Sequence, residues 1–140
     1  MNYEEIFENV PCALFIVDQD MRVLDFNRSA FTFFRQEPDG KSTFLGNVLQ
    51  CEYALSDQGG CGASDHCREC LLRDSIVKSV RREKIGKLIV RLTLMTDAGL
   101  TTEPFIVASA LAHQSEDQAK VALAIVRLSD WDRPGESGSN

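Results

Sequence analysis

The chain has little positive charge and no long apolar run, and both absences exclude kinds of partner. Its 140 residues include 15 Lys and Arg against 21 Asp and Glu, which leaves a net charge of −6. A surface that binds nucleic acid usually needs a basic face, so we expect no nucleic acid partner. No apolar run approaches the ~20 residues that span a bilayer, so we expect no membrane association.

The N-terminus lacks the features of a secretion signal. Its first residues, MNYEEIFENV, have neither a basic start nor an apolar core, and we therefore expect a cytoplasmic protein. Stable disulfides are uncommon in that compartment, so clustered cysteines there are more often metal ligands or redox-active thiols. The cysteine count of five is odd, which argues weakly against a fully paired disulfide framework.

Motifs of catalysis are also missing. The sequence shows no Ser/His/Asp arrangement, no phosphate-binding loop and no pair of carboxylates in a recognisable context. We therefore expect that the chain is not an enzyme. Hydrophobic residues make up 44% of the chain, enough for one real core, and the length suits one domain.

Local patterns in the first third of the chain predict helix, hairpin and helix. Apolar residues at spacings of three and four predict a short helix over 2–10, which Pro11 ends. Two runs rich in β-formers predict a hairpin over 13–27. A second short helix is expected over 28–35, with Asn27 as its N-cap.

The middle of the chain is predicted to hold a glycine-rich loop and a longer helix. Residues 43–55 are expected to form one or two helical turns, and 56–66 a loop, because three of the four residues from 59 to 62 are glycine. An apolar stripe then predicts a helix over roughly 67–83, capped by Ser64 or Asp65.

Three strands are predicted to close the chain. Alternating patterns cover 87–96, 103–112 and 120–130, each separated from the next by a turn or polar loop. Together with the hairpin they predict a five-stranded antiparallel sheet with helices on one face, an α+β fold. The last residues, 133–140, are expected to be a flexible tail or linker stub.

Two stretches of the sequence resemble the PAS domain family. The opening run YEEIFENVPCALFIVDQDMRVLDFNRSAFTFF has the family's first helix, its I-V-D-x-D-x-R-V pattern and an Asn that begins a helix. The runs PFIVASALA and VALAIVRLSDWD are similar to its closing strands, with Asp130-Trp131-Asp132 in place of the usual Asp-Ile-Thr-like exit. The resemblance implies a PAS sensory domain over 1–132.

Four cysteines follow the pattern C-x9-C-x5-C-x2-C, at Cys51, Cys61, Cys67 and Cys70. This pattern resembles a cysteine-bearing subset of PAS domains found in bacterial sensor kinases and cyclic-dinucleotide regulators. The resemblance implies a domain of signal transduction, as in two-component systems. It also implies a homodimer and a downstream kinase or other output domain as partners.

The chemistry of the four thiols leaves several ligands open. Zinc and iron–sulfur clusters both favour four thiolates, and His66 is an alternative zinc ligand. Cys67 and Cys70, three apart, are expected on one face of a helix start. The helix N-terminus and nearby arginines, Arg68 and Arg73, are expected to lower the thiol pKa values. That would serve metal binding and thiol–disulfide switching equally, and a packed set without cofactor also remains open.

The sequence thus predicts a PAS sensory domain that is redox- or metal-responsive through its cysteines. The alternative is a module for protein interaction or dimerisation, with a structural zinc or merely packed cysteines. A third possibility is an apolar pocket for a small metabolite, whose candidate lining residues also suit an ordinary core. These candidates are Phe15, Phe31, Phe34 and Leu92. Flavin is not expected, since Cys51 follows Leu49-Gln50 rather than preceding such a pair as in light-sensing members.

Overall fold

The computed structural model describes residues 2–34, 44–56, 61, 67, 70–83 and 87–131. It leaves the side chains of Phe33, Phe34, Leu55, Ser56 and Trp131 undescribed. The predicted loop over 56–66, the caps at Ser64 or Asp65 and the tail over 133–140 therefore lie wholly or mostly outside the described residues.

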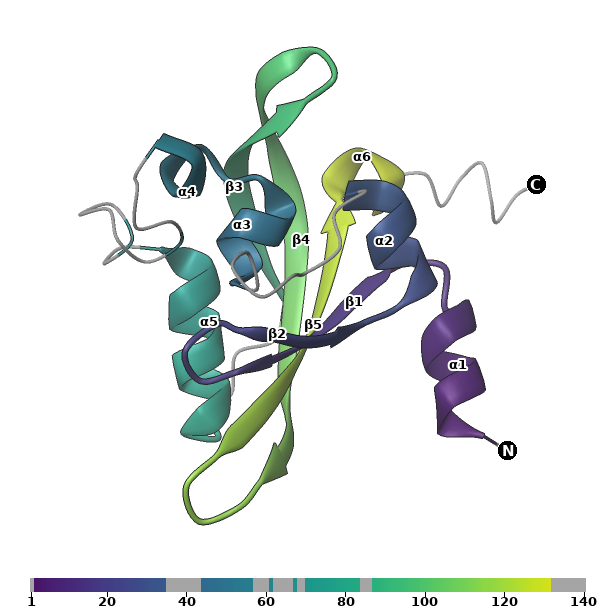
Figure 1. The fold of residues 1–140 in the computed structure, drawn as a ribbon, viewed down its shortest axis with the longest axis vertical. Coiled ribbons are helices and arrows are strands. Elements are labelled where there is room, and N and C mark those ends of the chain that lie inside the picture. The colour runs from purple at the N-terminus through teal and green to yellow at the C-terminus, as the bar shows by residue number, and fades with distance from the viewer. Residues whose placement is uncertain are drawn as a thin grey trace.

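One antiparallel sheet with the strand order β2-β1-β5-β4-β3 forms the centre of the fold (Figure 1). Its strands are β1 (Ala13–Asp18), β2 (Val23–Phe26), β3 (Lys87–Thr96), β4 (Gly99–Gln114) and β5 (Ala119–Arg127). The helices are α1 (Tyr3–Asn9), α2 (Arg28–Phe34), α3 (Leu45–Leu49), α4 (Glu52–Ser56), α5 (Leu71–Val80) and α6 (Leu128–Trp131). None of the described helices is long and apolar enough to cross a membrane. The predicted α+β class and five-stranded antiparallel sheet are confirmed.

The alternation of side chains along the strands buries one face of the sheet. Phe15 of β1 pairs with Leu123 of β5, and both side chains are fully buried. The register of the neighbouring strands continues this face, because Val90 of β3 pairs with Phe105 of β4. Helices α3 and α5 add buried Leu and Ile side chains to the same core. Successive residues of a strand point to opposite faces. The side chains of β1 and β5 on the other face, such as Leu14 and Ala124, are only half-buried.

Asn27 ties the first hairpin to α1 and α2 from a position that is 1% exposed. Its Oδ1 accepts hydrogen bonds from the backbone N–H groups of Leu14 and Ala30, both at 3.0 Å. Its Nδ2 donates to the carbonyl oxygens of Cys12 at 2.9 Å and Val10 at 3.4 Å. The bond to Ala30, the third residue of α2, confirms the predicted N-cap.

Some element boundaries differ from the prediction. Helix α5 begins at Leu71 rather than near residue 67, because its N-cap Cys70 has an extended backbone with ψ 119°. Strand β4 begins at Gly99, whose φ of +95° closes a tight turn after Thr96 that suits glycine. Strand β5 ends at Arg127, and the next four residues form α6 instead of continuing the strand to residue 130.

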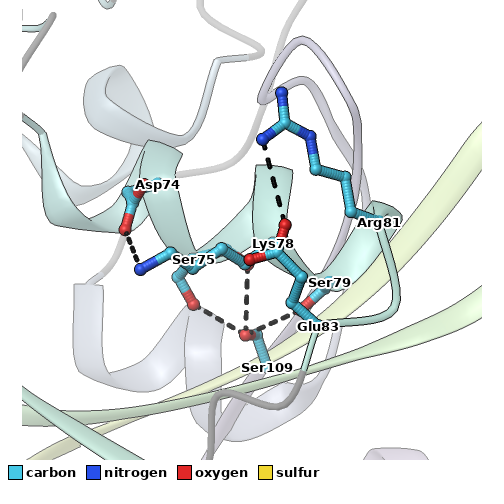
Figure 2. Close-up of polar contacts among 7 residues, drawn as sticks. All are labelled: Asp74, Ser75, Lys78, Ser79, Arg81, Glu83 and Ser109. Carbon is cyan, nitrogen blue, oxygen red and sulfur yellow. Dashed lines mark hydrogen bonds and ion pairs between the residues drawn. The ribbon is translucent and has the colours of Figure 1, made fainter.

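Three serine hydroxyls hold α5 against β4 (Figure 2). Ser75 and Ser79 are one turn apart on α5, and both contact Ser109 of β4, at Oγ–Oγ distances of 2.6 and 2.9 Å. The side chains of Ser75 and Ser79 are almost fully buried. Buried hydroxyls are stable only when they are hydrogen-bonded, so this cluster sets the register of α5 on the sheet. The Lys78–Asp74 ion pair of the same helix is about half exposed, and such pairs stabilise little.

Replacing Ser109 by alanine is expected to lower the free energy of unfolding by about 1–3 kcal/mol, because two buried hydroxyls lose their shared partner. Denaturant unfolding measures the change. The matched control is Ser115→Ala, since Ser115 is an exposed serine beyond the end of the same strand. A loss at Ser109 no larger than at Ser115 would show that the cluster does not stabilise the helix–sheet contact.

Candidate functional site

The first turn of α3 brings Cys51 and Cys61 to the same residue, Gly46. The backbone N–H of Cys51 donates to the carbonyl oxygen of Gly46 at 2.8 Å. A Cβ atom added to Gly46 would lie only 2.7 Å from the Sγ of Cys61, so the sulfur sits directly over the glycine. The N–H of Cys61 donates to Oδ1 of Asn47 at 3.0 Å, which holds the Cys61 backbone on α3. Two cysteines ten positions apart thus both contact the first turn of α3.

Cys51 is also attached to the edge of the sheet. It forms an isolated antiparallel bridge with Leu94 of β3, and the N–H of Met95 donates to the carbonyl oxygen of Gln50 at 2.9 Å. Gln50 adopts the left-handed conformation, with φ of 62°, and so turns the chain from α3 onto the strand. A displacement of Cys51 would therefore act on β3.

Cys67 and Cys70 are joined by a turn that leads into α5. The N–H of Cys70 donates to the carbonyl oxygen of Cys67 at 3.2 Å, and Cys70 is the N-cap of the helix. Its side chain makes no capping hydrogen bond. The prediction that both cysteines lie on the helix itself is wrong, because the helix starts one residue after Cys70. They are neighbours through the turn instead.

Burial controls the charge state of the buried thiols. It raises the pKa of Cys61 to about 11, although the backbone N–H of Gly46 opposes the shift. Burial also raises the pKa of Cys70, against the effect of the Arg73 and Leu72 amides. The expected lowering of the thiol pKa values is therefore wrong for both residues, since removal from water outweighs the amides of the helix start. Arg68 lies outside the described residues.

Cysteines from separate segments act electrostatically on Cys61 and Cys70. Negative charge on Cys67, Cys70 or Cys51 raises the pKa of Cys61, and Cys51 and Cys67 do the same for Cys70. All four are free thiols of intermediate exposure, and Cys51, Cys61 and Cys70 pack against the edge of the core. Like charges repel, so four thiolates at these positions would be stable together only with a compensating cation.

The described side chains do not by themselves form a metal site. Among the residues that the structure describes, no group of three or more His, Cys, Asp or Glu is arranged to hold a metal ion. His66 lies outside these residues. A four-cysteine metal site thus stays a prediction, and binding would have to draw the sulfurs together and release their protons.

Of the predicted pocket residues whose side chains the structure describes, Phe15 and Leu92 do not line the hollow that Phe31 borders. Phe15 and Leu92 belong to the core, with 0% and 9% of their surfaces exposed, whereas Phe31 on α2 is 43% exposed. The side chain of Phe34 is outside the described set. Phe31 instead lines a hollow of about 610 Å³ between α1, β2 and α2, and no cysteine is among the residues that line it. The sequence did not predict this hollow. The one signal that could have indicated it is the amphipathic pattern of residues 2–10, which predicts a helix with an apolar side.

Comparison with known proteins identifies the architecture. A PAS domain from a two-component sensor histidine kinase superposes with a TM-score of 0.54 at 8% identity, covering 89% of this chain and 92% of that one. The PAS domain of nitrogen regulation protein NR(II) from Vibrio parahaemolyticus gives 0.53 at 15% identity, covering 91% and 98%. The sequence model of the PAS domain family also matches residues 1–68. The chain folds as a PAS domain.

A third structure shows how widely this fold is shared. The LOV protein of Rhodobacter sphaeroides has a TM-score of 0.58 at 11% identity, covering 96% of this chain and 70% of its own. No curated protein matches the sequence. Identities this low establish the fold alone, so the resemblance to the cysteine-bearing subset of PAS domains stays a prediction and the function has to be argued from the site.

Proposed function

We propose that this PAS domain is a cytoplasmic sensory module, not an enzyme, whose signal is received by the thiols of Cys51, Cys61, Cys67 and Cys70. The output is a kinase or another signalling domain. PAS domains of similar fold occur in a two-component sensor histidine kinase and in a nitrogen regulation protein, which supports an output of this kind. The assignment to the thiols is supported by the position of the Cys61 sulfur over Gly46 of α3 and of Cys70 at the N-cap of α5.

The observation that carries this proposal is that cysteines from separate segments contact α3 and the start of α5: Cys51 and Cys61 both contact Gly46, and Cys70 is the N-cap of α5. Cys51, Cys67 and Cys70 each act on Cys61, although the four residues span twenty positions of the sequence. Burial keeps Cys61 and Cys70 protonated at neutral pH, and a protonated thiol is a poor partner for thiol–disulfide exchange. A zinc ion or an iron–sulfur cluster would relieve the repulsion between thiolates, so a metal centre is the favoured ligand.

The contacts of the site suggest how its state reaches the rest of the domain. Cys70 is the N-cap of α5, which is hydrogen-bonded to β4 through Ser109, and Cys51 forms a bridge with Leu94 of β3. A change in the bonding of the sulfurs would move α5 and β3 relative to the sheet. Helix α6 contacts β4 and follows β5 directly, so it is placed to carry the change towards the C-terminus. Coupling of this kind requires two states with different contacts.

Protein purified without oxygen is expected to contain iron and sulfide, or zinc. In the double variant Cys67→Ser, Cys70→Ser the metal content is expected to fall by about tenfold or more, because two of the four ligands are absent. Elemental analysis and the visible absorption spectrum measure the content. The control is Cys12→Ser. Cys12 directly precedes β1 and is not one of the four candidate ligands.

The response to air distinguishes an iron–sulfur centre from a structural zinc site. A coloured centre with iron and sulfide that bleaches in air would establish a redox or oxygen sensor. Colourless protein with one zinc, insensitive to oxidant, would contradict sensing and leave a structural site. Wild-type protein without metal, or equal metal in the double variant, would contradict the metal centre altogether.

The second candidate function is a dimerisation module, and the outer face of the sheet favours it. Leu14 and Ile16 of β1 and Ala122 and Ala124 of β5 alternate with the core residues and are only half-buried, while Ile89 of β3 is 62% exposed. Small and apolar side chains on a sheet face allow a second copy to pack closely. A dimer that persists whatever the state of the thiols would favour this function over sensing.

A further inference from the structure

A hollow lined by phenylalanines lies between three elements at the N-terminal end of the domain. Phe7 comes from α1, Phe26 from β2 and Phe31 from α2. The rings of Phe26 and Phe31 are 6.4 Å apart and tilted by 32°, and Phe31 remains 43% exposed. The volume of about 610 Å³ is enough for one or two large side chains of a partner.

The rim of this hollow is acidic. Glu4 and Glu8, one turn apart on α1, and Asp25 on β2 line it, and Arg28 is the single basic residue among the lining side chains. These four residues carry a net charge of −3 + 1 = −2. In the described part of the chain, the ion pairs link other residues and none involves these three carboxylates. The hollow is therefore suited to an occupant that is apolar in the middle and positively charged at its edges.

The apolar side of α1 extends this surface beyond the hollow. Tyr3 is 83% exposed and Ile6 is 42% exposed, and no residue of α1 is buried. Leu24 of β2 is a further exposed apolar side chain on one of the bordering elements, at 44%. Exposed apolar side chains gathered with an open hollow mark a surface for a partner. A small molecule in the hollow would leave Tyr3 and Ile6 exposed. A helix of a partner that lies along α1 would cover both side chains.

Charge decides which helix fits. A second copy that docked through its own α1 would bring Glu4, Glu5 and Glu8 close to identical carboxylates, in a chain of net charge −6. We propose that the hollow, together with the apolar side of α1, binds a basic amphipathic helix of a different protein. Its apolar side chains would enter between Phe7, Phe26 and Phe31, and its Lys or Arg residues would pair with the carboxylates of the rim. No cysteine takes part, so this site is independent of the thiols.

The full chain is titrated against a fluorescent amphipathic helical peptide of leucine and lysine, about 14 residues long, and binding is followed by anisotropy. The triple variant Glu4→Gln, Glu8→Gln, Asp25→Asn is expected to weaken binding about tenfold or more, and to remove most of its salt dependence. Phe31→Ala, at an exposed ring that the core does not need, is expected to weaken binding as well.

The matched control neutralises three exposed carboxylates in the β3–β4 and β4–β5 turns, through Asp97→Asn, Glu116→Gln and Asp117→Asn. The proposal expects this variant to bind like the wild type. Equal weakening in the control would show unspecific charge attraction and overturn the site. Equal binding of a peptide of leucine and glutamate would overturn the basic partner. Self-association lost in Phe31→Ala would assign the surface to a second copy, and displacement of the peptide by benzyltrimethylammonium would assign it to a small cation.

Discussion

Replacing Asn27 by leucine is expected to lower the free energy of unfolding by about 4 kcal/mol or more, close to the whole stability of a marginal domain. Leucine has the same number of side-chain heavy atoms and the same branching at Cγ, but it can neither donate nor accept a hydrogen bond. The N–H groups of Leu14 and Ala30 and the carbonyl oxygen of Cys12 would lose their partner while they stay out of water. Each unsatisfied buried group costs about 1–3 kcal/mol. Chemical denaturation followed by circular dichroism measures the loss.

Asn9→Leu provides the control for this substitution. Asn9 is exposed at the end of α1, and its side chain donates only to the carbonyl oxygen of Glu5 within the same helix. The same chemical change there is expected to alter stability by less than about 0.5 kcal/mol. Similar small losses at both positions would mean that Asn27 does not join the hairpin to the two helices, and that the core alone holds them in place.

Replacing Gly46 by valine is expected to remove the metal or thiol response of the site by about tenfold or more while the fold persists. A Cβ atom at residue 46 would lie 2.7 Å from the Sγ of Cys61 and 3.1 Å from its Cβ, so the cysteine would have to move away from α3. Such overpacking costs about 1–3 kcal/mol. Metal content, the anaerobic spectrum and the denaturation midpoint are measured on the same preparation.

Ala30→Val separates displacement of the cysteine from general strain. Ala30 is buried in α2, so valine overpacks the core there without touching any cysteine of the set. We expect a similar loss of stability with the metal or thiol response intact. Full retention of the response in Gly46→Val, or an equal loss in Ala30→Val, would contradict the placement of Cys61 in the site.

The elements that the sequence predicted well are those whose signals are local. The helix over 2–10, the first hairpin and the N-cap at Asn27 depend on spacings of a few residues, and strand 87–96 has the bounds that its alternation predicts. The start of the helix near Cys67 was wrong. Its apolar stripe is compatible with either start, whereas the extended backbone of Cys70 is imposed by the turn that packs it against the core.

For the candidate site too, some features can be read from the sequence and others depend on the packed structure. The spacing of Cys51, Cys61, Cys67 and Cys70 predicts these four residues as candidate ligands, because residue types and intervals can be read from the chain, and their common role stays a prediction. It could not give the direction of the pKa shifts at Cys61 and Cys70. Those depend on how much water the surrounding helices exclude, and that burial is a property of the packed domain.

The sequence by itself determined the class of the fold, the covered face of the sheet and the residues available for soft-metal chemistry, since periodicity and composition act through near neighbours. Only the tertiary structure decided that Cys51 and Cys61 both contact Gly46. It also decided that Phe7, Phe26 and Phe31 from three elements surround one acidic hollow. Both arrangements depend on contacts between segments that are distant in the chain, and such contacts form only when the apolar face of the sheet is buried.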